Sequence, residues 1–217
     1  QSYFHQKWSR FARFYLKIGE KVCCRWADKV IVVSQGLKNY VKNVYNREAY
    51  YIPNGVSVPK SQKEAEQIKK WGLEKENYIL SVSRLVKHKG IHYLIDAYKQ
   101  LNTDKKLVIV GGSSKTDDYV KELHQQADND PDIIFTNDQS GEVLKELFSH
   151  AYLFVQPSES EGLSIALLEA MAYGLPVLAS NIPENAEVLE ENDLLFRSGD
   201  SQDLKGKLEK MLSANSE

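Results

Sequence analysis

The sequence lacks the features of a disulfide-rich, membrane-spanning or nucleic-acid-binding protein. Its two cysteines, Cys23 and Cys24, are adjacent and therefore poorly placed for a structural disulfide. No apolar run approaches the roughly 20 residues that span a bilayer, and the N-terminus has no signal-peptide pattern. The 28 Lys and Arg nearly balance the 30 Asp and Glu, so nothing global favours nucleic acid as a partner. We therefore expect a cytoplasmic protein in a reducing compartment.

Common site signatures are absent as well. No cluster of Cys and His has the spacing of metal ligands, so we expect no metal. Gly111 and Gly112 follow an apolar run in the manner of a phosphate-binding turn. The third spaced glycine of the dinucleotide fingerprint and the Lys-Ser/Thr pair of the nucleotide-triphosphate loop are, however, missing. These glycines can equally serve to turn the backbone or to let a ligand approach closely.

From residue 78 onward the sequence alternates regularly between strand and helix patterns. Mostly short links between them indicate an α/β fold, a parallel sheet with helices on both faces. In such sheets ligands bind at the carboxyl ends of the strands, near a topological switch point. The expected strands are Tyr78–Ser83, Lys106–Gly111, Ile133–Thr136, Ala151–Gln156 and Pro176–Ala179, and the expected helices are Ile91–Leu101, Asp117–Ala127, Gly141–Ser149, Leu163–Tyr173 and Ser201–Leu212.

The first 57 residues stand apart from this alternation. We expect a helix at Tyr3–Ala27, a buried strand at Lys29–Ser34 and a short helix at Leu37–Val44, followed by a Pro-Asn-Gly turn. One helix and one strand cannot cover both faces of a parallel sheet by themselves, and a charged stretch follows from Lys60 to Lys70. We therefore expect a domain boundary here, with residues 1–57 as one part and residues 58–217 as the other.

The helix expected at Tyr3–Ala27 is amphipathic and basic, and two interpretations remain open. In the one we prefer, its apolar side packs on a sheet and its basic side is solvated. In the other, the helix makes peripheral contact with an anionic membrane surface, at its inner face. The apolar side consists of Trp8, Phe11, Tyr15, Ile18, Val22 and Trp26, and the basic side of Lys7, Arg10, Arg13, Lys17, Lys21 and Arg25.

The most informative stretch runs from Pro157 to Met171. It follows an apolar strand and opens an Ala-rich helix, so backbone N–H groups and the positive end of a helix dipole face outward there and attract an anion. Glu161 lies in the turn, and Glu169 lies about two turns into the helix. These carboxylates can form a general acid/base pair, or they can accept hydrogen bonds from ligand hydroxyls. We favour the binding interpretation.

Two cations and a polar loop follow other strands of the expected sheet. Arg84 offers a planar fork and Lys89 a flexible point charge to one diphosphate. A solvated basic loop would show the same pattern. The loop that begins at Thr136 can present backbone groups to a base, or it is an ordinary polar loop.

Together these segments resemble the C-terminal domain of retaining GT-B glycosyltransferases of family four, the glycosyl transferases group 1. The resemblance covers about Ile31 to the C-terminus. It implies a Rossmann-like donor-binding domain, preceded by the tail of an N-terminal acceptor domain whose body is missing from this sequence. The motifs that carry it are Ser83-Arg84-Leu85 with Lys89-Gly90, Ile52 to Val56, Glu161 and Glu169 with seven residues between them, and Gly174-Leu175-Pro176-Val177.

The resemblance also implies a role for each matching residue. Arg84 and Lys89 would hold the donor diphosphate and stabilise it as a leaving group. Glu161 would contact hydroxyls of the transferred sugar, and Glu169 those of the ribose. The remaining expected donor contacts are Gly111, Thr136, Gly162, Leu163 and Ser164, the last of which stands where Gly is commoner. The family mostly needs no metal in this site, and no other cofactor is expected.

The expected function is therefore transfer of a hexose-type sugar from a nucleotide-diphosphate donor to an acceptor, with retention of configuration. The chain would be mainly the donor half and inactive by itself, because the reacting groups must be enclosed between two domains. A second hypothesis is a non-catalytic nucleotide-sugar sensor or assembly module on the same fold. The sequence selects neither the base, nor the sugar, nor the acceptor.

Overall fold

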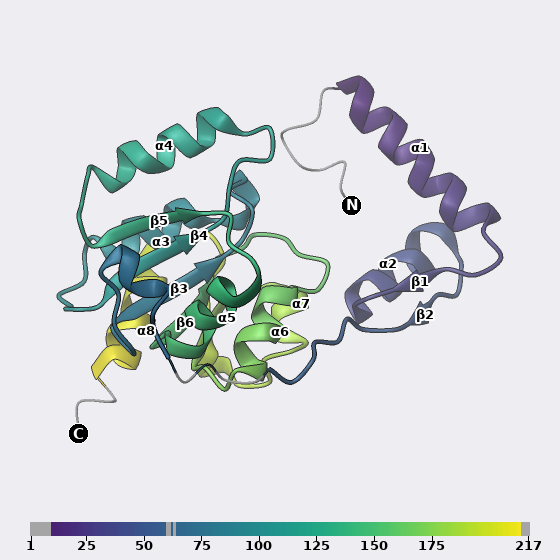
Figure 1. Ribbon diagram of the computed structural model, residues 1–217. Coiled ribbons are helices and arrows are strands. Elements are labelled where there is room, and N and C mark those ends of the chain that lie inside the picture. Colours follow the sequence, from purple (N-terminus) through teal and green to yellow (C-terminus); the bar gives the residue numbers. More distant parts are fainter. Residues whose placement is uncertain (1–9, 60–61, 63, 214–217) are drawn as a thin grey trace. The chain divides into compact units, whose positions relative to one another are not determined.

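The chain divides into two compact units, Gln1–Asn54 and Gly55–Glu217. The computed structural model describes residues 10–59, 62 and 64–213 (Figure 1). The identification of the first unit as the end of an acceptor domain stays a prediction. The two units are described separately below.

The first unit contains two helices and two very short strands in its described part. Strands β1 (Ile31–Val32) and β2 (Tyr50–Tyr51) pair in parallel, helix α2 (Gln35–Tyr45) packs beside them, and helix α1 (Arg10–Trp26) packs on α2. Ser34 caps α2, because its Oγ accepts a hydrogen bond from the Leu37 N–H at 3.2 Å. The small core of the unit consists of Cys24, Val32, Val41 and Ala49.

Helix α1 does not pack through the side that its amphipathic pattern favoured. The buried residue of α1 is Cys24, whereas Phe11 is 80% and Trp26 is 78% exposed. The expectation that the apolar side packs on a sheet is therefore wrong for this unit, because two strands of two residues present too little surface to cover it. The expected buried strand Lys29–Ser34 is likewise reduced to Ile31–Val32, with Ile31 exposed. Trp8 and Lys7 lie outside the described residues.

The second unit contains one parallel sheet of six strands within the described residues. The strand order is β5-β4-β3-β6-β7-β8, and every neighbouring pair is parallel. This is the doubly wound order of dinucleotide-binding folds, in which the first and fourth strands of the unit lie side by side. The strands are β3 (Tyr78–Val82), β4 (Lys106–Val110), β5 (Ile133–Asn137), β6 (Leu153–Gln156), β7 (Val177–Ser180) and β8 (Leu195–Phe196).

Alternating side chains of the strands enter two cores, one on each face of the sheet. In β3, for example, Ile79 faces the core beneath α3, α4 and α8, and Leu80 faces the core beneath α5 and α6. Figure 1 shows α4 on one side of the sheet and α5 and α6 on the other. The helices are α3 (Ile91–Tyr98), α4 (Asp117–Ala127), α5 (Gly141–His150), α6 (Ile165–Ala172), α7 (Pro183–Ala186) and α8 (Ser201–Ser213), with shorter helical turns η2 (Ile68–Trp71), η3 (Lys87–Lys89) and η4 (Asn192–Leu194).

The predicted α/β fold with helices on both faces is confirmed, and each strand and helix expected between residues 78 and 217 is present to within a few residues. The sequence did not predict β2, β8 or α7. Each of these elements has two to four residues, too few for a periodic pattern to appear. In the described part of the chain, no helix is long and apolar enough to cross a membrane.

Candidate functional site

The reversal of strand order opens a cleft at the carboxyl ends of β3 and β6. After β3 the chain turns to α3 on one face of the sheet, and after β6 it turns to α6 on the other, so the two connections diverge. The cleft has a volume of about 440 Å³. It is lined by Val82, Ser83, Arg84, Lys89, Val110, Gly111, Asp138, Gln139, Glu161, Leu163, Ser164, Ile165, Ala166 and Glu169.

A close backbone contact forms the floor of the cleft between β3 and β4. Gly111 has φ of +146°, and a Cβ atom at this position would lie 1.8 Å from the carbonyl oxygen of Ser83. Only glycine fits such a position. The Ser83 Oγ is buried and has no hydrogen-bond partner within the described chain, and Ser83 also lines the cleft. A buried hydroxyl of this kind gains from a ligand that supplies the missing partner.

An ion pair between Lys89 and Glu161 joins the β3 and β6 sides of the cleft. The Lys89 Nζ lies 2.5 Å from Glu161 Oε1 and 2.7 Å from Oε2. The side chains are 14% and 7% exposed, respectively. Glu161 also accepts a hydrogen bond from the amide of Gln156, a residue that the sequence analysis did not single out. The predicted phosphate-binding cation and the predicted sugar-binding carboxylate are thus in contact with each other.

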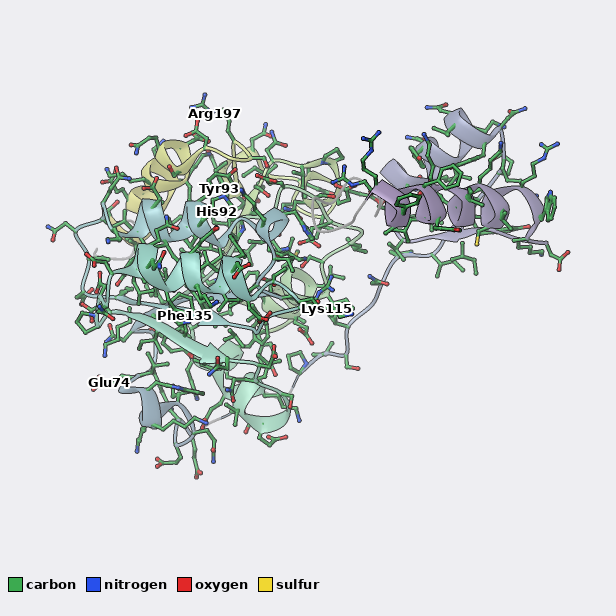
Figure 2. The ribbon with its side chains drawn as sticks, turned by 90° about the horizontal axis from the view of Figure 1, so that it is seen from above. Glu74, His92, Tyr93, Lys115, Phe135 and Arg197 are labelled. Carbon is green, nitrogen blue, oxygen red and sulfur yellow. The ribbon has the colours of Figure 1, made fainter. Side chains whose placement is uncertain are left out.

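Two further hydrogen bonds hold the loops of this ion pair together. The backbone N–H of Glu159 donates to the His88 carbonyl at 2.8 Å, which links the loop after β6 to η3. The Tyr93 hydroxyl, on α3, donates to Glu159 Oε1 at 2.6 Å. Figure 2 shows Tyr93 beside His92 on that helix. The Lys89 and Glu161 backbones are therefore fixed by contacts other than their own ion pair.

Glu169 lines the cleft from α6, one turn beyond Ile165. Burial raises the pKa of this carboxyl above its ordinary value of 4.5. The described residues provide no hydrogen bond or ion pair for its side chain, so the cleft holds an uncompensated, half-buried carboxylate. Such a group favours a ligand that donates hydrogen bonds.

Arg84 is the exposed cation of the cleft. Its guanidinium makes no hydrogen bond or ion pair with any described residue, in contrast to Lys89. The N-terminus of α6 lies at the same cleft, with Leu163, Ser164 and Ile165 among the lining residues. An anion in the cleft would therefore meet a planar cation and the positive end of a helix dipole together.

Two of the predicted donor contacts do not line the cleft. Thr136 is 3% exposed, and its hydroxyl lies 3.2 Å from the Asn137 carbonyl oxygen. Its own carbonyl accepts from the Gln139 side chain. The threonine side chain is therefore buried, with its hydroxyl at the backbone carbonyls of Ile109 and Asn137, because Thr136 belongs to β5 itself rather than to the following loop. Gly162 is exposed in the turn beside the lining residues Glu161 and Leu163.

The loop after β5 reaches the cleft through two residues other than Thr136. Asp138 and Gln139 line it, and the Asp138 carboxylate lies so close to Gly112 that a Cβ atom there would be 2.3 Å from Oδ2. Because side-chain direction alternates along a strand and is free in the following loop, sequence alone could not choose among these neighbouring positions.

Comparison with known families assigns separate matches to the two parts of the chain. The model of the glycosyl transferases group 1 matches residues 63–217. The model of a domain of unknown function, DUF1972, matches residues 1–57.

Individual relatives agree with the family match. The O-antigen chain mannosyltransferase RfbU of Salmonella typhimurium is 33% identical over 195 residues, which are 88% of this chain and 52% of that protein. The capsular polysaccharide biosynthesis glycosyltransferase CapM of Staphylococcus aureus is 25% identical, over 95% of this chain and 58% of that protein. The chain thus spans about half the length of the curated relatives it matches.

Among solved structures, the Anabaena protein HepE in complex with UDP-glucose is similar in fold. It superposes with a TM-score of 0.82 at 26% identity, over 93% of this chain and 58% of HepE. The lipopolysaccharide glycosyltransferase WaaG has a TM-score of 0.73 at 18% identity, which is a similarity of fold alone.

Proposed function

This chain belongs to the glycosyl transferases group 1 family, and on that basis we propose that it is mainly the donor-binding half of a retaining glycosyltransferase. Its substrate would be a nucleoside-diphosphate sugar. The observation that carries the proposal is the convergence of Arg84, Lys89 with Glu161, and Glu169 on one cleft at the switch point of the sheet. A diphosphate, a sugar and a ribose require these three kinds of group close together.

In the proposed complex the donor lies along the carboxyl edge of the sheet. Arg84, Lys89 and the amides of Leu163 and Ser164 bind the diphosphate at the N-terminus of α6. Glu161 accepts from sugar hydroxyls, and Glu169 accepts from the ribose. Adjacent parallel strands are about 4.8 Å apart, so the three intervals from β6 to β5 measure roughly 14 Å, which is enough to place the base near Asp138 and Gln139.

The proposed chemistry needs no nucleophile from the protein. The bond between the sugar's anomeric carbon and the diphosphate oxygen breaks, and the acceptor oxygen bonds to that carbon on the same face. The acceptor proton passes to the leaving phosphate. Arg84, Lys89 and the dipole of α6 stabilise the charge that develops on the diphosphate. No metal is part of the proposal, because these cations provide the positive charge for the leaving group.

The acceptor side is proposed to come from a further part of an N-terminal domain. The apolar side of α1 is exposed, and the relatives named above are nearly twice as long as this chain. Contact between α1 and an anionic membrane at its inner, cytoplasmic face stays a prediction.

A thermal-shift screen tests the donor proposal. UDP, GDP, ADP and dTDP, each alone and as a sugar nucleotide, should be compared. A ligand at about 100 times its Kd stabilises the folded state by roughly 2.7 kcal/mol, which is a shift of several degrees. We expect one base to stabilise the chain and Arg84→Ala to remove the shift. Failure of every nucleotide to stabilise the wild-type chain would contradict the proposal, whereas binding without transfer by a longer protein would favour a sensor.

Glu169→Gln is expected to stabilise the fold and to weaken nucleotide binding by roughly tenfold. Burial raises the pKa of Glu169, so the folded chain holds this proton more tightly than the unfolded chain. Stability therefore falls as pH rises through the window above 4.5, the ordinary pKa. Glutamine has no charge to bury, and the variant should have the higher Tm at neutral pH, with the difference vanishing in acid.

Thermal unfolding across this pH range and calorimetric titration with nucleotide measure both effects. Glu190→Gln, at an exposed carboxylate outside the cleft, is the matched control and should change neither. Unchanged nucleotide affinity in Glu169→Gln would show that the ribose assignment is wrong, and a lower Tm at neutral pH would contradict the stabilisation expected from removing a buried charge.

A further inference from the structure

A chain of buried amide and hydroxyl groups leads from the start of α6 to Glu161. Gln156, the last residue of β6, is 3% exposed, and Ser164, the N-cap of α6, is 7% exposed. The Ser164 hydroxyl lies 2.8 Å from Gln156 Oε1. The amide nitrogen of Gln156 contacts Glu161 Oε1 and lies 3.1 Å from the Ser158 hydroxyl. The family resemblance assigns no role to Gln156.

The chemistry of these groups fixes the direction of each hydrogen bond. The Ser164 Oγ accepts from the Leu167 N–H at 3.3 Å, as an N-cap does, so its proton is available for Gln156 Oε1. A carboxylate can only accept, so Glu161 requires the NH₂ side of the Gln156 amide. The two demands agree. With the amide turned over, its oxygen would face the carboxylate, and two acceptors would be in contact.

We infer that Gln156 is the positioning residue for Glu161, and that the Ser164 hydroxyl holds the Gln156 amide in the required orientation. The inference rests on the proposed function of the cleft, because it assigns Gln156 an effect on sugar recognition through Glu161. It also gives the Ser164 hydroxyl a second role beside capping α6, because the same group that accepts from the Leu167 N–H donates to the Gln156 amide oxygen.

The arrangement fixes Glu161 from two sides. Lys89 contacts both carboxylate oxygens, and Gln156 contacts Oε1. When a bound diphosphate draws Lys89 away from Glu161, the hydrogen bond from Gln156 remains. That hydrogen bond then keeps the Glu161 carboxylate directed at the sugar. Gln156 itself does not line the cleft, so it acts through Glu161 and not on the donor. Precise positioning of such a group depends on its buried hydrogen-bonding support.

The test compares each nucleoside diphosphate with its sugar nucleotide in wild type and variants. The probes are UDP with UDP-glucose, GDP with GDP-mannose, ADP with ADP-glucose and dTDP with dTDP-rhamnose. For the pair that the wild type binds, Gln156→Leu should weaken the sugar nucleotide about five- to tenfold and change the nucleotide by less than twofold. Ser164→Ala should act in the same direction, Ser164→Thr should retain the wild-type ratio, and the double variant Gln156→Leu/Ser164→Ala should be no worse than Gln156→Leu.

Ser180→Ala is the matched control. Ser180 is a fully buried hydroxyl on the neighbouring strand β7 that donates to the Ser158 carbonyl and not to Gln156 or Glu161. Loss of this hydroxyl should lower the Tm without changing the ratio of the two affinities. A smaller folded fraction lowers the apparent affinity for both ligands by the same factor.

The possible outcomes distinguish failure of the inference about Gln156 from failure of the proposed donor-binding function. A Gln156→Leu variant with the wild-type affinity ratio overturns the inference alone. A wild type that binds none of the probes overturns the proposed function, and the inference with it. A wild type that binds a nucleoside diphosphate and its sugar nucleotide with equal affinity overturns the sugar assignment of Glu161, and with it the positioning role of Gln156.

Discussion

Lys89→Met is expected to weaken donor binding by about two orders of magnitude and to destabilise the second unit by roughly 3 kcal/mol. The two effects have one origin. Removing a buried cation leaves the carboxylate of Glu161, whose side chain is 7% exposed, without its counter-charge, and breaking a buried pair in this way costs about 3–5 kcal/mol. The hydrogen bond from Gln156 offsets part of this cost. The diphosphate also loses a charge-assisted contact, worth about 1.5–3 kcal/mol.

A double variant separates the two effects. In Lys89→Met/Glu161→Gln no buried charge remains at the pair, so the stability measured by urea unfolding should recover while nucleotide affinity stays low. Lys87→Met, at an exposed lysine of the same turn that does not line the cleft, is the control for general charge effects and should bind normally. Normal nucleotide affinity in the double variant would contradict the assignment of Lys89 to the diphosphate.

Gly90→Ala is expected to destabilise the second unit by more than about 3 kcal/mol. Gly90 has φ of +69°, and a Cβ atom there would lie 1.9 Å from the carbonyl oxygen of Pro157. The Pro157 backbone is buried and begins the loop that carries Glu161, so it cannot move away without disturbing the cleft. The close approach of the β3 and β6 loops therefore requires glycine. Far-UV circular dichroism during urea unfolding measures the loss.

Gly174→Ala provides a matched control for this prediction. Gly174 has a similar φ of +75°, but nothing lies within 4 Å of the Cβ position. Its substitution should therefore cost only the left-handed backbone strain, about 1–2 kcal/mol. Equal losses in the two variants would show that conformational strain, and not the contact with Pro157, makes glycine necessary at position 90.

The family motifs are local in sequence, and this is why the site could be located without a structure. Arg84 and Lys89 both follow one strand, and Glu161 and Glu169 both follow another. The rule that parallel strands end at one edge of a sheet brings the two groups together.

Other features depend on contacts between segments far apart in the chain. No pattern in the sequence indicates that Lys89 pairs with Glu161, that Gly90 lies against Pro157, or that the amide of Gln156 contacts Glu161. Gln156 is the last residue of an apolar strand, where its burial is evident but its partner is not. Which side of α1 packs was likewise not decided by its amphipathic pattern, because the pattern does not say what surface is available to cover it.

The sequence by itself determined the α/β architecture and the strand ends that carry the candidate site, because periodicity and turn residues act over a few neighbouring positions. The tertiary structure alone decided which of these groups touch. It buried Thr136, placed Asp138 and Gln139 at the cleft and joined Lys89, Glu161, Gln156 and Ser164 into one hydrogen-bonded system. Those outcomes depend on side-chain direction and on distances across the sheet, which the packing of the whole unit sets.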